Sequence, residues 1–206
     1  MVENPLKTSR KRSRHRLRKT NTREKLIAAA RGVFSEKGLD LTRIDEITER
    51  ADVGKGTFYY HFRTKENIIR EVIREVMAEL VDMIDERCAE TTDLRELLDK
   101  LIGAHISFFC NRWEDFVLYF QGRTDLTLRE GYAGIEPPFV EYLQHVEGLL
   151  ASVINYRLPG PVLRRLACAV AGFVSGYYSF AVVTSQEEDV DETFSSLRGA
   201  MVASLA

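Results

Sequence analysis

The stretch VGKGTFYYHF, Val53–Phe62, decides the fold of this chain, because it can be read in two ways. Gly54, Lys55 and Gly56 look like part of a phosphate-binding loop, but three consecutive aromatic residues, a histidine and a further phenylalanine come soon after them. A loop of the form GxxxxGK[ST] needs a glycine where Glu49 stands and a serine or threonine where Gly56 stands. Since no strand precedes the stretch either, we reject the phosphate-loop interpretation.

As a helix, residues 55–62 have one side for the core and one for solvent. At about 100° per residue, Phe58 and Phe62 lie one above the other and are predicted to face inward. The other side presents a small residue, a hydroxyl, two phenols and an imidazole, from Gly56, Thr57, Tyr59, Tyr60 and His61. Such groups can contact phosphates and base edges, and two adjacent tyrosines cannot both face one core. This side is therefore predicted to be exposed and to bind nucleic acid.

A second short helix is predicted just upstream, over Arg43–Ala51, where Thr42 and Asp45 resemble a capping box. Its two isoleucines are predicted to be buried, and residues 52–54 form a tight turn that contains a glycine. Two short helices joined by such a turn are typical of a helix-turn-helix motif.

The first predicted helix is Thr22–Lys37, with Thr22 as the N-cap and Gly38 as the stop. The segment before it, Lys7–Lys19, holds 8 Lys and Arg in 13 residues and is predicted to be disordered on its own. It is either a solvated tail or an arm that follows phosphates or enters a minor groove.

Charge is unevenly distributed along the chain. Residues 1–63 carry 16 Lys and Arg against 8 Asp and Glu, a net of +8. Residues 64–206 carry 13 against 23, a net of −10, and the two sum to the −2 of the whole chain. This asymmetry indicates that only the first third meets a polyanion.

Several other classes of protein are disfavoured by the sequence. The sequence has no apolar run of about 18 residues, so no membrane span is expected, and its polar, basic start does not resemble a secretory signal. The three cysteines are widely spaced and predicted to be reduced core residues: Cys88, Cys110 and Cys168. Neither a metal motif nor a catalytic motif surrounds the four scattered histidines, His15, His61, His105 and His145. We therefore expect no enzyme activity, no metal and no cofactor.

The rest of the chain is predicted to be helical, with no strand of convincing alternation. The predicted helices are Lys65–Cys88, Asp93–Asn111, Asp115–Arg123, Phe139–Tyr156, Val162–Thr184 and Asp191–Leu205. Pro137 and Pro138 suit a helix start, and Leu158–Pro161 is a firm break. The predicted fold class is all-α, with about nine helices.

Residues 42–68, TRIDEITERADVGKGTFYYHFRTKENI, resemble the DNA-binding region of the tetracycline-repressor (TetR) family of bacterial regulators. The resemblance extends over Thr22–Ile69, about a quarter of the chain. It implies a cytoplasmic repressor that binds a palindromic operator in double-stranded DNA as a homodimer and is released by a small molecule. The expected domains are a flexible arm over 1–19, a helix-turn-helix head over 20–64, and a helical effector-binding and dimerisation body over 65–206.

The resemblance also assigns roles to single residues. Family members contact bases and the nearby backbone at the positions of Lys55, Gly56, Thr57, Tyr59 and Tyr60, and phosphates at those of Thr42, Arg43, His61 and Lys65. Two positions depart from the family pattern. Gly54 replaces a serine that often caps the recognition helix, a position that glycine can fill at modest cost. Thr48 replaces a usual alanine and is expected to be partly exposed.

The effector pocket is expected within residues 93–184, because a small-molecule site needs a mostly apolar cavity with a few polar groups. The candidate residues are His105, Phe109, Trp113, Tyr119, Arg123, Tyr142 and Tyr177. Each can instead belong to the core, and Arg123 can pair with a nearby acid rather than bind a carboxylate or phosphate. The region loosely resembles family members that sense fatty acyl compounds; an aromatic or cationic xenobiotic is the alternative effector.

The last two helices, 162–184 and 191–205, carry small residues and an apolar stripe, respectively. The resemblance implies that they form a four-helix bundle with a second chain; the alternative is that they belong to this chain's own core. A dimer would hold two recognition helices about 34–36 Å apart, or a multiple of this, for successive major grooves. The rival interpretation is a non-specific or architectural nucleic-acid-binding protein that acts through the Arg-rich arm.

Overall fold

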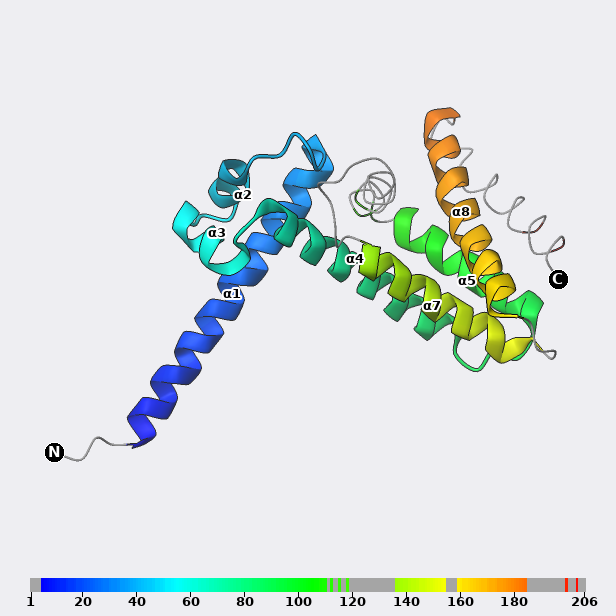
Figure 1. Ribbon diagram of the computed structural model, residues 1–206, viewed down its shortest axis with the longest axis horizontal. Helices are drawn as coiled ribbons and strands as arrows, with labels where there is room; N and C mark the ends of the chain where they lie inside the picture. The colour runs from blue at the N-terminus through cyan, green and yellow to red at the C-terminus, as the bar shows by residue number, and fades with distance from the viewer. Residues whose placement is uncertain are drawn as a thin grey trace. The chain divides into compact units, whose positions relative to one another are not determined.

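The structure, a computed structural model, describes residues 5–110, 112, 115, 118, 136–154, 159–184, 199 and 203, without the side chains of residues 5–19, 110, 136, 173–175 and 177–184. Seven helices and no strand occur in these residues (Figure 1). The helices are α1 (Pro5–Lys37), α2 (Ile44–Arg50), α3 (Lys55–Phe62), α4 (Lys65–Cys88), α5 (Leu94–Cys110), α7 (Glu136–Val153) and α8 (Gly160–Thr184). The predicted all-α class is confirmed.

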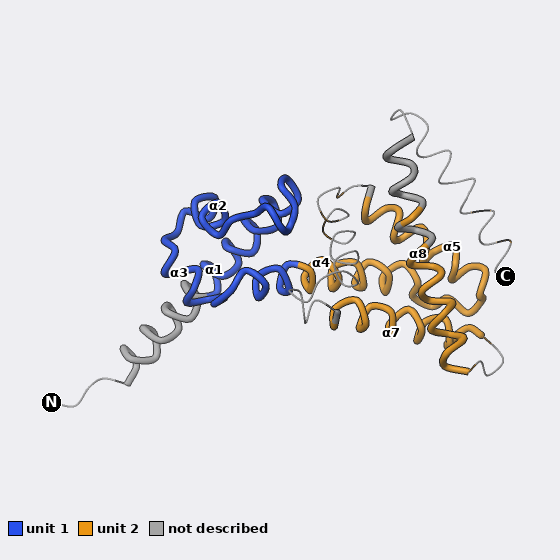
Figure 2. The backbone as a smooth tube through the Cα atoms, turned by 45° about the horizontal axis from the view of Figure 1, so that its top comes forward, with its two compact units in different colours: residues 1–72 blue, residues 73–206 orange. Residues whose placement is uncertain are grey.

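Two compact units divide the chain, residues 1–72 and 73–206 (Figure 2). The division falls within α4, at Val72, and therefore later than the expected boundary after residue 64. The first turns of α4 belong to the first unit, where Ile68 and Ile69 are fully buried.

The start of α1 differs from the prediction. The helix begins at Pro5 and not at Thr22, so residues 5–19 are helical rather than a flexible arm. Proline suits the first helical position, and the Lys and Arg residues that follow are good helix formers, so nothing between Pro5 and Thr22 stops the helix. The predicted stop is confirmed: α1 ends at Lys37, Gly38 has a φ of 85°, and its N–H donates to the Phe34 carbonyl at 2.7 Å.

The first unit packs α1, α2, α3 and the start of α4 around one apolar core. The large side chains at its centre are almost completely buried: Leu26, Phe34, Leu39, Ile47, Phe58, Ile68 and Ile69. An ion pair between the Arg23 guanidinium and the Glu71 carboxylate, at 2.5 Å, joins α1 to α4 at the edge of this core.

The second unit contains the rest of α4 together with α5, α7 and α8. Contacts join α5, α7 and α8 to one another, and buried apolar residues follow helical spacing, as in Val76, Leu80 and Ile84 of α4. Arg87 of α4 donates to the Gly103 carbonyl at 3.0 Å and to the Ser107 hydroxyl at 2.7 Å, both on α5.

Most predicted helix bounds agree with the structure to within a few residues. α3 and α4 have the predicted bounds, and α2 and α5 are each one residue shorter at both ends. α7 starts at Glu136, so both prolines that follow lie in its first turn, and it ends at Val153 rather than Tyr156. The predicted helices Asp115–Arg123 and Asp191–Leu205 lie largely outside the described residues.

α8 starts at Gly160, two residues before the predicted Val162. The Pro159 carbonyl accepts the N–H groups of Val162 at 2.8 Å and Leu163 at 3.3 Å, which opens the helix. Pro161 does not prevent this start, because an N–H in the first turn has no partner within the helix in any case.

The cysteines differ in burial. Cys88 is 5% exposed, as predicted, and burial raises the pKa of its thiol. Cys168 on α8 is exposed, so its predicted place in the core is wrong, and the side chain of Cys110 lies outside the described residues. Across the described ranges, none of the helices combines the length and the apolar character that crossing a membrane requires.

Candidate nucleic-acid interface and effector pocket

α2 is opened by Arg43 and Glu46 rather than by the predicted pair of Thr42 and Asp45. The Arg43 N–H donates to the Glu46 carboxylate at 2.9 Å, and Lys37 also donates to that carboxylate. These hydrogen bonds, first from Lys37 and then from Arg43, lower the pKa of Glu46. The hydrogen bond from the N-cap N–H to a side chain three residues later therefore lies one residue later than predicted, and Arg43 has no side-chain acceptor to complete a capping box.

The loop between α1 and α2 is held by two residues that were expected to bind phosphate. Thr42 is 2% exposed, and its hydroxyl donates to the Gly38 carbonyl at 2.7 Å, while its phosphate contact stays a prediction. Lys65 donates from Nζ to the carbonyls of Asp40 at 3.0 Å and Thr42 at 2.8 Å. The role of Lys65 in the loop is observed, whereas its phosphate contact stays a prediction.

The turn between α2 and α3 is fixed by its backbone. Asp52 adopts a φ of 53°, a left-handed conformation that is uncommon outside glycine, and Gly54 is the N-cap of α3 as expected. Arg63, directly after α3, also has a φ of 53°. Thr48 lies before this turn and is 4% exposed, against the expectation of partial exposure, because its hydroxyl turns inward to donate to the Asp45 carbonyl at 3.0 Å.

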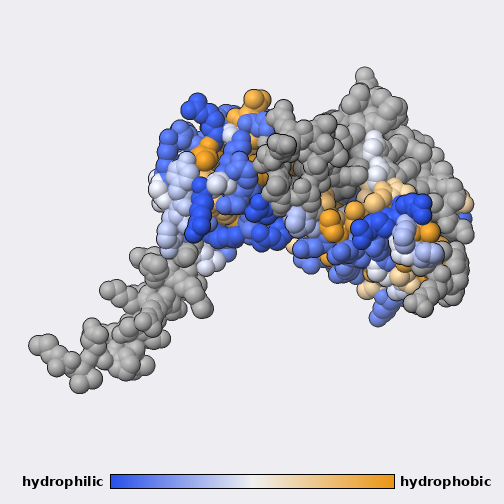
Figure 3. Space-filling view, viewed as in Figure 1, coloured by the Kyte–Doolittle hydropathy of each residue, from blue (hydrophilic) through white to orange (hydrophobic). Residues whose placement is uncertain are grey.

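α3 has the two sides that its sequence predicts. Phe58 and Phe62 are 0% and 4% exposed, whereas Tyr59 and Tyr60 are 50% and 63% exposed. On the face drawn in Figure 3, the described surface of the first unit is mostly hydrophilic. Exposed phenols can meet a partner, which is the arrangement that reading a nucleic acid requires.

Gly56 has no packing reason to be glycine. A Cβ atom added there would meet nothing within 4 Å. Glycine destabilises a helix interior by about 1 kcal/mol relative to alanine, and Gly148 on α7 has the same open space, so it is the place of Gly56 on the exposed side of α3 that makes it a candidate for close approach by a partner.

Positive side chains border this side of α3. Lys55, the first residue of α3, and Arg43, directly before α2, are both exposed. Both lie near the Asp45 carboxylate, at 2.6 Å for Lys55 Nζ and 4.0 Å for the Arg43 guanidinium. Thr57 and His61 are partly exposed on the same helix.

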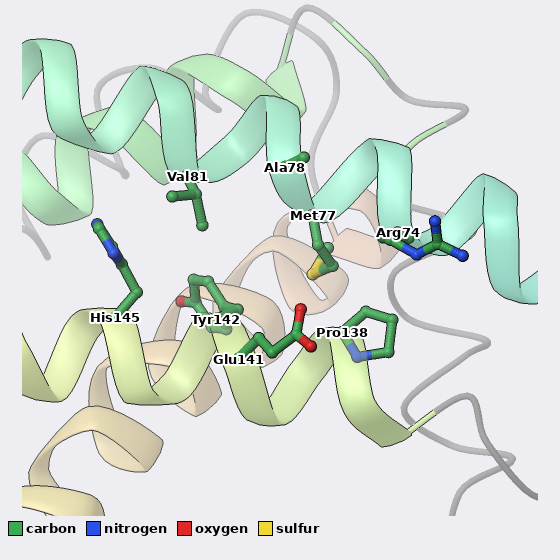
Figure 4. A pocket seen from close by; sticks show the side chains of 8 residues that line it. All are labelled: Arg74, Met77, Ala78, Val81, Pro138, Glu141, Tyr142 and His145. Carbon is green, nitrogen blue, oxygen red and sulfur yellow. The ribbon is translucent and has the colours of Figure 1, made fainter.

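A pocket of about 340 Å³ lies in the second unit between α4 and α7 (Figure 4). Eight residues line it: Arg74, Met77, Ala78 and Val81 of α4, and Pro138, Glu141, Tyr142 and His145 of α7. Its middle is mostly apolar, and Arg74 and His145 stand at opposite ends in the view of Figure 4. His145 Nε2 also lies 2.6 Å from the Asp85 carboxylate of α4.

Three of the predicted pocket residues can be placed with their side chains. Tyr142 lines the pocket, whereas His105 and Phe109, 1% and 0% exposed on α5, do not. Trp113, Tyr119 and Arg123 and the side chain of Tyr177 lie outside the described residues, so their roles stay predictions.

His105 and Tyr142 form a buried hydrogen-bonded pair. His105 Nδ1 lies 2.7 Å from the Leu101 carbonyl and Nε2 lies 2.5 Å from the Tyr142 hydroxyl. Both contacts are satisfied by the neutral ring with its proton on Nδ1, which donates to the carbonyl while Nε2 accepts from the phenol. Burial lowers the pKa of His105 to about 4, so the ring is neutral at physiological pH.

Sequence reasoning missed most of the pocket. The four residues from α4 and the four from α7 follow the same spacing, i, i+3, i+4 and i+7, which marks one face of each helix. This spacing can be read in the sequence, but the face of a helix that packs into a core shows the same spacing, so it does not identify a pocket. Among the residues that the structure describes, no group of three or more His, Cys, Asp or Glu side chains could hold a metal ion.

The fold and the interface together define an all-helical protein with a helix-turn-helix head. Residues 26–72 match the family model described as "Bacterial regulatory proteins, tetR family". These residues therefore carry the DNA-binding region of this family, to which the sequence motif shows its resemblance.

Similar proteins include two curated regulators of Bacillus subtilis (strain 168). The HTH-type transcriptional regulator YvdT is 29% identical over 123 residues, which is 60% of this chain and 63% of the relative. The fatty acid metabolism regulator protein is 26% identical over 134 residues, which is 63% of this chain and 66% of the relative. In both cases the match spans less than two thirds of the relative's length.

A solved structure extends the likeness in fold. The transcriptional regulator FadR from Bacillus subtilis, in complex with stearoyl-CoA, has a TM-score of 0.73 at 22% identity, over 89% of this chain and 99% of FadR. At this identity the likeness shows that the two chains share a fold.

Proposed function

We propose that the protein is a ligand-responsive transcriptional repressor of the bacterial cytoplasm. It binds a palindromic operator in double-stranded DNA as a homodimer, and a small molecule releases it. The observation that carries this proposal is the outer side of α3, where Tyr59 and Tyr60 are exposed beside the open position of Gly56. No catalytic role is proposed.

The proposed DNA contacts divide between bases and phosphates. Lys55, Gly56, Thr57, Tyr59 and Tyr60 are placed at base edges and the adjacent backbone, and Arg43, His61 and Lys65 at phosphates. Base contacts specify the sequence, whereas phosphate contacts set the position and orientation of the protein on the duplex. A tyrosine ring can touch a thymine methyl group while its hydroxyl bonds a phosphate.

The test begins with the selection of duplexes from a random pool by the full-length protein. We expect a palindromic consensus, and we expect Tyr59→Ala to lose preference for it over a scrambled duplex while its thermal unfolding stays unchanged. Glu86→Ala, at an exposed position of α4, is the control and should bind as the wild type does. Equal loss in both variants would contradict the interface, and selection of no consensus would contradict the function.

Deleting residues 1–19 separates the repressor from an architectural protein that acts through its basic segment. Among the side chains that the structure describes, the buried ones of α1 begin at Leu26, and the deletion leaves all of these in place. We expect the truncated protein to keep its sequence preference and to lose affinity at low salt, because affinity falls with salt in proportion to the phosphates neutralised. Preference that vanished with the segment would favour the architectural alternative.

The effector site proposed here is the pocket between α4 and α7. A mostly apolar lining that also carries Arg74, Glu141 and His145 suits an amphipathic molecule. A long-chain acyl compound is the first candidate, supported by the relative named as a fatty acid metabolism regulator and by the stearoyl-CoA in the FadR structure. α4 lines the pocket and starts directly after the recognition helix, so a ligand that moves α4 can lower DNA affinity, typically by about 1–3 kcal/mol of coupling.

Filling the pocket tests this assignment. Ala78→Trp puts bulk into the pocket, and Glu86→Trp puts the same bulk on an exposed position of the same helix that does not line it. We expect stearoyl-CoA to release the wild type and Glu86→Trp from the selected operator, but not Ala78→Trp, which still binds DNA. Coenzyme A without an acyl chain is the ligand control. Release by coenzyme A alone, or no release of the wild type by stearoyl-CoA, would contradict an acyl effector.

A further inference from the structure

One carboxylate stands between the two cations at the start of α2 and α3. Asp45 Oδ1 lies 2.6 Å from Lys55 Nζ, and its other oxygen, Oδ2, lies 4.0 Å from the Arg43 guanidinium. The three side chains are 46%, 61% and 78% exposed in the order Asp45, Lys55, Arg43. An acid is therefore placed among groups that are proposed to meet a polyanion.

Stability does not explain this arrangement. Exposed ion pairs contribute about 0–1 kcal/mol, because both partners are well solvated and lose side-chain entropy. Lys55 is a cation at the N-terminal end of α3, where the positive end of the helix dipole repels it, and the Asp45 carboxylate offsets this repulsion. The contact also places the Lys55 ammonium against the Asp45 carboxylate in the absence of DNA.

We propose that Asp45 is a specificity-determining residue, which holds Lys55 by its carboxylate and withholds it from DNA phosphates. This inference rests on the proposed function, in which Lys55 faces the operator. Asp45 does not itself read a base; it is a positioning residue that acts through Lys55.

The contacts of Lys55 are expected to differ between non-specific complexes and the operator complex. Non-specific binding depends on phosphate contacts, and a phosphate that approaches Lys55 also approaches the Asp45 carboxylate, which repels it. At the operator, an ammonium has three N–H donors, so Lys55 can keep one bond to Asp45 and donate another to a base acceptor in the major groove. Asp45 therefore lowers non-specific affinity more than operator affinity.

The first experiment measures the full-length wild type, Asp45→Asn and Glu49→Gln on the selected operator and on a scrambled duplex over a range of salt. Glu49 is an exposed acid on the same helix, and its variant makes the same change in net charge. We expect Asp45→Asn to bind the scrambled duplex about tenfold more tightly, with a salt slope steeper by about one phosphate. Its operator affinity should change much less, and Glu49→Gln should keep the wild-type ratio of the two affinities.

A double-mutant cycle with Lys55→Met tests the route of the effect. In the Lys55→Met background, Asp45→Asn should leave the ratio of operator to scrambled affinity unchanged. Asp45→Glu should restore most of the wild-type ratio, and thermal unfolding should be the same in all single variants at α2. An equal ratio in Asp45→Asn and Glu49→Gln, or an undiminished effect without Lys55, would overturn the inference. A wild type without any operator preference would instead refute the proposed function.

Discussion

Gly56 is a residue at which stability and function are expected to oppose each other. Gly56→Ala should stabilise the protein by about 0.5–1 kcal/mol, because alanine loses less backbone entropy in a helix and the new methyl group meets no atom of the chain. The same methyl group should weaken operator binding by standing between α3 and the DNA. Denaturant unfolding and operator affinity measure the two effects.

Gly148→Ala is the matched control, since Gly148 is an exposed helical glycine on α7 with open space around it. It should give a similar stabilisation and bind the operator as the wild type does. Unchanged operator affinity in Gly56→Ala would mean that DNA does not approach this position closely.

His105 makes stability depend on pH in a defined window. Its pKa is lowered in the folded protein from 6.5 to about 4 by burial, so the unfolded chain takes up the proton first as pH falls. The contribution is therefore fully present above about pH 6.5, is lost as pH falls towards about 4, and changes no further below that. Its full size is roughly 3 kcal/mol.

Free energies of unfolding from pH 7 to pH 4 measure this contribution in the wild type and in His105→Gln. Because carboxylates titrate in part of the same range, the quantity to compare is the slope, which should be smaller in the variant. Parallel curves would show that His105 is not the titrating group.

The burial of some single residues can be predicted from the sequence, whereas the hydrogen-bond partners of others cannot. The burial of Phe58 and the exposure of Tyr59 follow from helix geometry alone, and both are confirmed. The hydroxyl of Thr42 donates to the carbonyl of Gly38 within an irregular loop, and no sequence pattern predicts the geometry of such a loop. Likewise, the carbonyl partners of Lys65 lie more than 20 positions away in the chain.

At the scale of elements, Lys65 joins the first turn of α4 to the loop before α2. Lys65→Met keeps the apolar stem and removes the donors to two carbonyls, so stability should fall by about 1–2 kcal/mol. The salt slope of DNA binding should stay unchanged if the loop is the main role of this residue. Chemical unfolding and a salt titration on a scrambled duplex decide between the two roles. A slope smaller by about one with unchanged stability would favour the phosphate contact instead.

Elements are predictable where the chain marks their ends. Gly38 ends α1 and Gly54 caps α3, and the bounds of α3 and α4 follow from such signals. The start of α1 was missed because a dense run of like charges argues for disorder, although its residues are good helix formers. The α4–α7 pocket was missed because apolar spacing identifies a face of a helix but not whether a cavity or a neighbour covers it.

At the scale of the whole molecule, α8 leaves small residues exposed in the single chain. Ala169 and Gly176 are exposed, and a Cβ atom on Gly176 would meet nothing within 4 Å. We expect the protein to be a dimer with about twice the mass of 23.6 kDa. Gly176→Arg should give a monomer with unchanged helix content that has lost operator affinity, because one chain reaches only one half-site.

Native mass spectrometry measures the oligomeric mass of the wild type and of Gly176→Arg. Applied to protein purified from its own host, it also detects any bound small molecule. Glu86→Arg, on an exposed position of α4, controls for the added charge and should remain dimeric. A wild-type monomer would contradict the dimer and, with it, the spacing of the two recognition helices.

The turns on either side of α3 have a consequence for redesign. Of its eight residues, Phe58 and Phe62 are the buried ones, while Asp52 and Arg63 set the backbone direction just outside its ends. The anchoring of the helix is thus separate from the chemistry of its outer side. Exchanging residues 55–57 and 59–61 as a block should redirect the protein to new operators without a new fold, so this chain is a scaffold on which DNA specificity can be rewritten.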